Sequence, residues 1–118
     1  MTTTGKMQNK VALVTGGGGA IGGASARLLA SEGAKILVAD ERSETAEAVA
    51  QEIKDAGGAA EPIAIDVAEP SQCKAAVDAA VSAFGELHIL VNVAAAVTPD
   101  APVDELPLEE WNRAFAVN

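Results

Sequence analysis

The chain has 118 residues, a formal net charge of −9 and few aromatic residues: one Trp, two Phe and no Tyr. Its length predicts one domain, and a hydrophobic fraction of 49% with a single cysteine argues against both disorder and a disulfide-stapled scaffold. Acidic residues outnumber basic ones by 17 to 8 without a basic cluster, which argues against nucleic acid and anionic membranes as partners.

The sequence also bears on the cellular compartment. Cys73 has no second cysteine with which to form an internal disulfide, as is usual in a reducing compartment. Residues 1–6 lack the apolar core of a signal peptide, and no apolar stretch is long enough to span a membrane. We therefore expect a soluble, cytoplasmic protein.

Four short apolar runs, partly β-branched, predict buried strands. They cover residues 10–15, 35–40, 62–66 and 87–92. Pro62 suits a strand at the edge of a sheet, where the missing backbone donor breaks no ladder. Helical patterns separate these runs, so that strands and helices alternate along the whole chain. Such alternation predicts an α/β fold in which parallel strands are joined by right-handed crossovers and helices cover both faces of the sheet.

Four helices are predicted between and after the strands. The first ends at Gly33, the second begins at Ser43 as its N-cap and ends at Gly57, the third runs from Pro70 to Gly85, and the last runs from Leu108 to the C-terminus. Apolar residues at helical spacing predict the faces of the first three helices. These are Ile21, Ala24, Leu28 and Leu29, then Ala46, Val49, Ala50 and Ile53, and finally Cys73, Val77, Ala80, Val81 and Phe84.

A glycine-rich segment, Thr15–Gly22, lies between the first predicted strand and the first helix. In this context glycines allow a tight turn and a close approach to a pyrophosphate, and the helix N-terminus supplies unpaired N–H groups. Four consecutive glycines also suit a flexible turn without a ligand, so both interpretations stay open. A P-loop is excluded because no Lys follows the glycines to reach the β- and γ-phosphates.

Asp40 follows the second strand at the distance from the glycines where NAD proteins place an acid. Such a carboxylate accepts hydrogen bonds from the adenosine ribose 2′-OH and would repel a 2′-phosphate. Glu41 adds a second negative charge, while Arg42 adds a positive one. This pattern favours NAD over NADP, with a solvated acid in a turn as the alternative interpretation.

These segments together resemble the short-chain dehydrogenases/reductases. Residues 15–22 resemble the family's TGxxxGxG signature, Asp40 its NAD-selecting acid, and Asp66-Val67 the pair that holds adenine. Residues 90–95 resemble the family's LVNNAG segment, with Val93 in place of the second Asn and Ala95 in place of Gly. The resemblance implies a Rossmann-type, doubly wound, three-layer α/β/α fold with strand order 3-2-1-4. It also implies that cofactor-binding residues are Gly16, Gly18, Gly19, Ala20, Ile21, Gly22, Asp40, Asp66, Val67, Asn92, Val93 and Ala94.

The last helix carries the family's W-x6-N pattern as Trp111 and Asn118. The resemblance implies that Asn118 is the Asn of a catalytic tetrad of Asn, Ser, Tyr and Lys, where it holds a water that leads protons toward the Lys. In the family the Tyr is the acid/base, and this chain has no Tyr. We therefore expect residues 1–118 to be the NAD-binding N-terminal portion of one Rossmann-type domain, catalytically incomplete alone.

Other chemistry has little support in the sequence. The single His88 and the single Cys73 lack the partners that a metal site or a catalytic triad needs, so no metal is expected. The expected activity of the intact protein is hydride transfer between NAD and a small alcohol or ketone, in a homo-oligomer. Two alternatives stay open: a stand-alone nucleotide-binding or regulatory module, and a Rossmann-like domain for another adenosine ligand such as S-adenosylmethionine.

Overall fold

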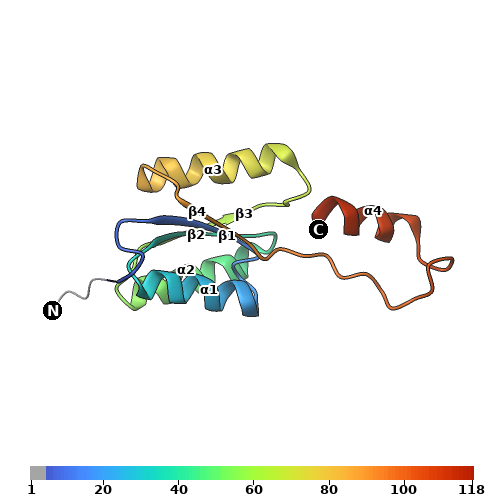
Figure 1. Ribbon diagram of the computed structural model, residues 1–118, viewed down its shortest axis with the longest axis horizontal. Helices are drawn as coiled ribbons and strands as arrows, with labels where there is room; N and C mark the ends of the chain where they lie inside the picture. Colours follow the sequence, from blue (N-terminus) through green and yellow to red (C-terminus); the bar gives the residue numbers. More distant parts are fainter. Residues whose placement is uncertain (1–4) are drawn as a thin grey trace.

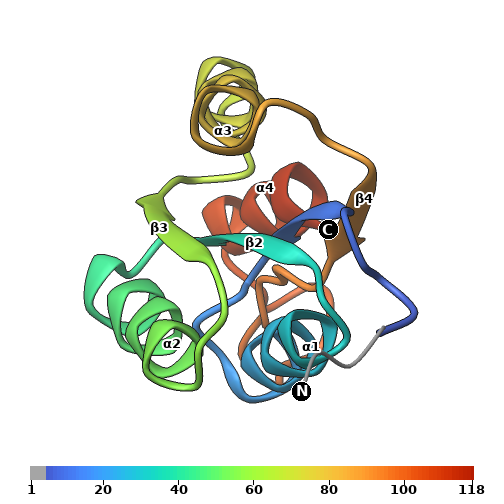
Figure 2. The ribbon, with the colours of Figure 1, turned by 90° about the vertical axis from the view of Figure 1, so that its left-hand side faces the viewer.

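In the computed structural model, which describes residues 5–118, parallel strands form a four-stranded sheet in the order β3-β2-β1-β4. The strands are β1 (Val11–Thr15), β2 (Lys35–Asp40), β3 (Ala60–Ala64) and β4 (Ile89–Asn92). The helices are α1 (Ala20–Ser31), α2 (Ser43–Asp55), α3 (Pro70–Phe84) and α4 (Leu108–Val117). Helices α1 and α2 cover one face of the sheet and α3 covers the other (Figures 1 and 2). The predicted α/β/α layers and strand order are confirmed.

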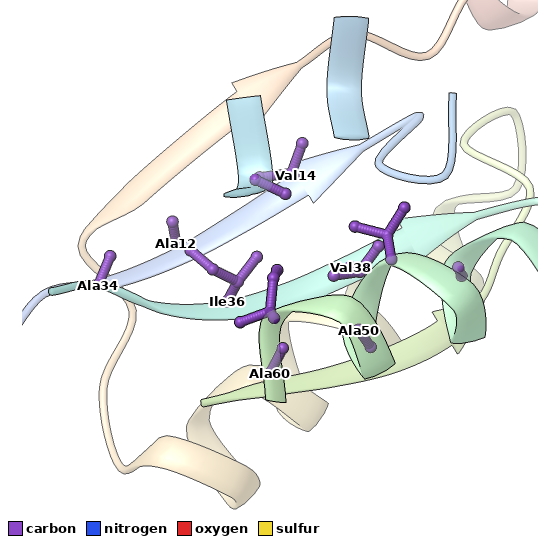
Figure 3. Close-up of a cluster of buried hydrophobic side chains, with 11 residues drawn as sticks. Ala12, Val14, Ala34, Ile36, Val38, Ala50 and Ala60 are labelled. Carbon is purple, nitrogen blue, oxygen red and sulfur yellow. The ribbon is translucent and has the colours of Figure 1, made fainter. Parts of the chain in front are cut away.

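The core is built on both faces of the two central strands. Alternate residues of β1 and β2, among them Val14 and Ile36, pack with α1 and α2 (Figure 3), while Leu13 and Leu37 face α3. This alternation follows from the two-residue period of a strand, and burial on both faces explains why the two sequences are almost continuously apolar. Full burial of a side chain such as Ile36 contributes about 1.5–3 kcal/mol.

The predicted face of α2 is confirmed, since Ala46, Val49, Ala50 and Ile53 are all buried. Its N-cap prediction is wrong: Arg42 is the N-cap, and Ser43 is the first helical residue, with its hydroxyl bonded to the Glu44 carboxylate. That hydroxyl is therefore not available to cap the backbone.

The predicted faces of α1 and α3 are only partly confirmed: Leu29 packs against the core and Ala80 is buried, but several of the larger apolar residues are exposed. In α1 the buried residues are Gly22, Gly23 and Ala26, whereas Ile21 is 73% exposed and Leu28 is 65% exposed. In α3 the buried residues are Ala76 and Ala80, whereas Val77 and Val81 are 42% and 45% exposed. Small residues let both helix backbones approach the sheet closely, so close packing outweighs the burial of larger side chains.

Three strands begin at other residues than expected. β1 begins at Val11, one residue later than predicted. β3 spans 60–64 rather than 62–66 because it pairs with β2 from Ala60, and Pro62 lies within this edge strand. β4 begins at Ile89 rather than at residue 87 because His88 precedes the ladder. The His88 N–H donates to the Val11 carbonyl at 2.9 Å, and its Nδ1 accepts the Val11 N–H at 2.9 Å.

Helix α4 stands beyond the carboxyl end of the sheet, at the end of the long segment 93–107 (Figure 1). It has no buried residue. The Cα radius of gyration is 15.6 Å, above the value of about 13.5 Å that a compact domain of this length would have, and the protruding α4 explains the excess. None of the helices in residues 5–118 combines the length and the apolar character that crossing a bilayer requires.

Candidate cofactor-binding site

The glycine turn is fastened to the end of β4 by one hydroxyl group. The Thr15 side chain is buried, and its Oγ1 accepts hydrogen bonds from the N–H groups of Val93 and Ala94 at 3.2 and 3.3 Å. Gly16 follows with φ +64°, and a Cβ there would lie 2.8 Å from the Ala94 nitrogen. Both the positive φ and this close approach require glycine at position 16.

The turn leads directly into α1. The N-cap is Gly19, and no side chain of the described chain caps the helix. The first turn of a helix leaves backbone N–H groups without helical partners, and the dipole places partial positive charge there. A Cβ at Gly22 would collide with the Gly16 carbonyl oxygen, so the helix backbone lies against the turn. This arrangement suits an anion at the N-terminus of α1.

Asp40, the last residue of β2, faces this turn and is held by two backbone donors. Its Oδ2 accepts the Gly18 N–H at 3.0 Å, and its Oδ1 accepts the Arg42 N–H at 3.0 Å. Each carboxylate oxygen keeps one further lone pair for an incoming hydroxyl. The carboxylate is thus oriented and can accept hydrogen bonds from a ligand beside the glycine turn.

Asp66 lies in the turn after β3 and is paired with an arginine from α4. Arg113 donates to Asp66 at 2.9 Å and to Glu41 at 3.0 Å, and the Ala68 N–H donates to the second oxygen of Asp66 at 2.9 Å. The bond from Arg113, followed by that from Ala68, lowers the pKa of the Asp66 carboxyl below its usual value of 3.8. Asp66 is therefore ionised at neutral pH.

These elements enclose a cavity of about 580 Å³ at the carboxyl end of the sheet. This volume is within the usual range for small-molecule sites. Most residues expected from the sequence to bind a cofactor line it, and those brought together are Gly16, Gly19, Ala20, Ile21, Gly22, Asp40, Asp66, Val67, Val93 and Ala94.

Three expected site residues do not line this cavity. Gly18 donates its N–H to Asp40, which does line the cavity. Asn92 and Asn118 line a second cavity of about 400 Å³, between α3, β4 and the end of α4. The side-chain amide of Asn118 is bonded to the backbone of Ala96, accepting its N–H and donating to its carbonyl, both at 2.9 Å.

Several residues around the first cavity are not found by sequence reasoning about a cofactor. They are Ala39, Ile65, Ala95, Ala96, Val97, Arg113 and Val117. One feature of the sequence could have drawn attention to Arg113: it is the only Lys or Arg after Lys74, in a stretch rich in acidic residues. The others are small or apolar and carry no chemical signal of their own.

The comparison with protein families agrees with this geometry. The family model described as short chain dehydrogenase matches residues 10–118. The chain belongs to the short-chain dehydrogenase family. It is thus homologous to NAD(P)-dependent oxidoreductases over their cofactor-binding half.

Several characterised short-chain dehydrogenases are similar to this chain. It is 43% identical over 113 residues to a cyclohexanol dehydrogenase of Acinetobacter sp. (strain SE19), covering 96% of this chain and 45% of that protein. It is 42% identical over 115 residues to a 3-alpha-(or 20-beta)-hydroxysteroid dehydrogenase of Mycobacterium bovis, covering 98% and 43%. It is also 42% identical to a D-threitol dehydrogenase of Mycolicibacterium smegmatis, covering 96% and 43%.

A solved short-chain dehydrogenase structure shows the same fold. A metagenomic short-chain oxidoreductase, crystallised in complex with NADP, superposes with a TM-score of 0.88 at 34% identity, covering 94% of this chain and 50% of that chain. The present chain therefore spans about half the length of the short-chain dehydrogenases that it matches.

The segment after β4 departs from the family pattern at two positions, Val93 and Ala95. Both residues line the first cavity. The Val93 N–H bonds to Thr15, and this backbone contact needs no Asn side chain at position 93. In the part of the chain that the structure describes, no three His, Cys, Asp or Glu side chains come together as metal ligands would.

Proposed function

We propose that residues 1–118 are the NAD-binding N-terminal portion of an oxidoreductase domain that transfers a hydride between the nicotinamide cofactor and an alcohol or ketone. One observation carries the preference for NAD: the Asp40 carboxylate lines the cavity, with both oxygens oriented by backbone N–H groups. It can accept hydrogen bonds from ribose hydroxyls, whereas it would repel a 2′-phosphate. The adjacent Glu41 adds a second negative charge, which its ion pair with Arg113 offsets in part.

The other residues of the cavity fit the remaining parts of a dinucleotide. The N-terminal turn of α1, with Gly19, Ala20 and Ile21, would hold the pyrophosphate through backbone N–H groups. The Asp66-Val67 pair would hold the adenine. Val93 and Ala94 would contact the nicotinamide side through their backbone. The bound cofactor supplies the hydride chemistry, and these residues bind and orient it.

Similarity to dehydrogenases named for cyclohexanol, a hydroxysteroid and D-threitol supports an alcohol or ketone substrate. We propose that residues 1–118 do not oxidise such alcohols by themselves, because the sequence contains no Tyr to serve as the family's acid/base. Under this proposal the chain binds the cofactor, and the proton transfer at the substrate needs residues outside this sequence.

Asn118 would serve the catalytic machinery from this half of the domain. Both polar groups of its side chain are used by the Ala96 backbone, which fixes the segment after β4 along the first cavity. The Oδ1 of Asn118 keeps a second lone pair and its Nδ2 a second N–H, so the side chain could still hold a water. We regard Asn118 as a positioning residue for the cofactor-side segment as well as a member of the expected tetrad.

The proposal includes self-association and a cytoplasmic location. β4 is an edge strand of the sheet in the described chain, and Leu90 on it is 58% exposed, next to the exposed Val77 of α3. An open edge beside exposed apolar side chains favours association with a second copy. The cytoplasmic location rests on Cys73 being the one cysteine of the sequence.

Calorimetry with NADH and NADPH tests the cofactor assignment. We expect NADH to bind more tightly than NADPH, and Asp40→Ala to weaken NADH binding about tenfold, which corresponds to the loss of a charge-assisted hydrogen bond. Asp55 is an acid at the end of α2 that does not line the cavity. Asp55→Ala is therefore the control and should bind NADH with unchanged affinity. Equal or tighter binding of NADPH by the unmodified chain would refute the preference.

A further inference from the structure

Arg113 joins three separate parts of the chain by two short ion pairs. It belongs to α4, and its guanidinium donates to Asp66 after β3 at 2.9 Å and to Glu41 after β2 at 3.0 Å. The Arg113 side chain is 39% exposed and that of Asp66 30%, so both are half-buried rather than free in water. The planar fork of arginine suits such a bridge, because its N–H groups point at two carboxylates at once.

Little else attaches α4 to the sheet. It contributes no residue to either buried cluster, and Figure 1 shows it connected to β4 through the extended segment 93–107. The Asn118 amide bonds to Ala96, which belongs to that same segment. Among the described residues, the side-chain hydrogen bonds from α4 to the turns after β2 and β3 both come from Arg113.

The bridge also lies where charge matters for a nucleotide. Asp40, Glu41, Asp66 and Arg113 all line the first cavity. Without the arginine, three carboxylates would converge at one end of a site for an anionic ligand, in a chain whose net charge is already −9. The guanidinium, which is cationic at neutral pH as in any arginine, offsets part of this negative charge, and its bond to Asp66 raises its pKa further.

We propose that Arg113 is a positioning residue of the nucleotide site, which anchors α4 across the ends of β2 and β3 and offsets the acidic charge at the adenosine end of the cavity. The proposal rests on the proposed cofactor function for its ligand, but the anchoring of α4 does not. Because anchoring and binding share the same contacts, a nucleotide in the cavity stabilises the anchored helix, and the anchored helix strengthens nucleotide binding.

Trp111 provides a direct probe of this anchoring. It is the only Trp of the sequence, lies on α4 two residues before Arg113, and stacks with Phe115 at a centroid distance of 5.1 Å. We expect Arg113→Gln to lower Trp111 fluorescence anisotropy and to raise its quenching by acrylamide in nucleotide-free protein. Far-UV circular dichroism and the thermal midpoint verify that the variant is folded, and Arg113→Lys gives a second, charge-retaining variant.

Arg27→Gln is the matched control. Arg27 also forms a half-exposed ion pair, with Glu52 at 3.1 Å between α1 and α2, but it does not line the cavity. We expect Arg113→Gln to weaken NADH binding about fivefold, the loss of half-exposed charge-assisted contacts, and Arg27→Gln to leave affinity and Trp111 unchanged. Arg113→Lys should fall between the two, since one ammonium cannot serve both carboxylates in the same way.

Adenosine monophosphate locates the effect within the site. If Arg113 acts at the adenosine end, Arg113→Gln lowers the affinity for adenosine monophosphate by the same factor as the affinity for NADH. Unchanged NADH affinity and unchanged Trp111 signals in Arg113→Gln would overturn the proposal, as would a loss for NADH without a loss for adenosine monophosphate. If the unmodified chain binds neither ligand, the cofactor function fails with the binding part of the proposal, and the Trp111 measurements alone decide the anchoring of α4.

Discussion

Gly22 and Gly16 meet backbone to backbone where the glycine turn enters α1. A Cβ on Gly22 would collide with the Gly16 carbonyl oxygen and would lie 3.0 Å from the Gly17 Cα. These are backbone atoms that cannot move aside as a flexible side chain can. The contact therefore fixes how α1 leaves the turn, and with it the position of the helix N-terminus in the cavity.

This contact distinguishes two glycines of the same turn. We expect Gly22→Ala to lower the free energy of unfolding by about 3 kcal/mol, the upper range for overpacking, because the turn must open. Gly19→Ala is the matched control: its φ of −85° suits any residue, and the nearest atom to its Cβ is 3.4 Å away. Its stability should change by about 0.5 kcal/mol at most. Urea unfolding of both variants measures the difference, and equal stabilities would contradict it.

The sequence predicts a helix face well where apolar residues recur at helical spacing between polar ones. The face of α2 is an example, since Val49 and Ile53 are buried as the spacing indicates. The same reasoning holds only in part for α1 and α3, which bury mainly glycine and alanine and leave Ile21 and Val77 exposed. Hydrophobicity ranks residues by transfer free energy, but close approach of two backbones selects for small size instead.

In the candidate site, too, some residues can be predicted from the sequence and others cannot. The glycine turn directly follows β1 and Asp40 is the last residue of β2, so spacing along the chain locates them. Arg113 could not be assigned in this way, because its partners Asp66 and Glu41 are 47 and 72 positions away and depend on where α4 lies. Likewise, no pattern shows that the Asn118 amide is occupied by the Ala96 backbone.

The Thr15 hydroxyl should control the order of the segment after β4. Replacing Thr15 by Val keeps the shape but removes the acceptor of the Val93 and Ala94 N–H groups. We expect a loss of about 1–3 kcal/mol in stability, and faster hydrogen exchange at these two amides. Thr15→Ser, which keeps the hydroxyl, should retain slow exchange at both. Identical exchange rates in Thr15→Val and the unmodified chain would argue against this role.

Acid should release α4 from the body of the chain. Arg113 and the Ala68 N–H lower the pKa of Asp66 in the folded chain below its usual value of 3.8. The stabilisation that the ionised Asp66 gives is therefore fully present above pH 3.8, and it is lost as the pH falls through the lower pKa of the folded chain. We expect Trp111 anisotropy to stay constant from neutral pH to about pH 4 and to fall below it. Glu41 and Glu69 also face Arg113, so Asp66→Asn should make this fall in Trp111 anisotropy smaller without abolishing it. A fall in anisotropy that occurs above pH 5, or one of the same size in Asp66→Asn as in the unmodified chain, would contradict the assignment to Asp66.

The free edge of β4 gives the last prediction, which concerns association. Leu90 on this edge strand is 58% exposed, and Val77 and Val81 of α3 are also exposed. Because unpaired strand groups and apolar side chains meet there, we expect sedimentation velocity to show association that increases with protein concentration.

A charge on this edge should prevent such association, since lysine on an edge strand opposes pairing with another chain. Leu90→Lys should therefore sediment as a monomer. Val103→Lys is the control, because Val103 is 72% exposed but lies in the segment before α4, away from the sheet edge. If the unmodified chain is monomeric at every concentration, or if both lysine variants associate equally, β4 is not the surface through which copies of this chain meet.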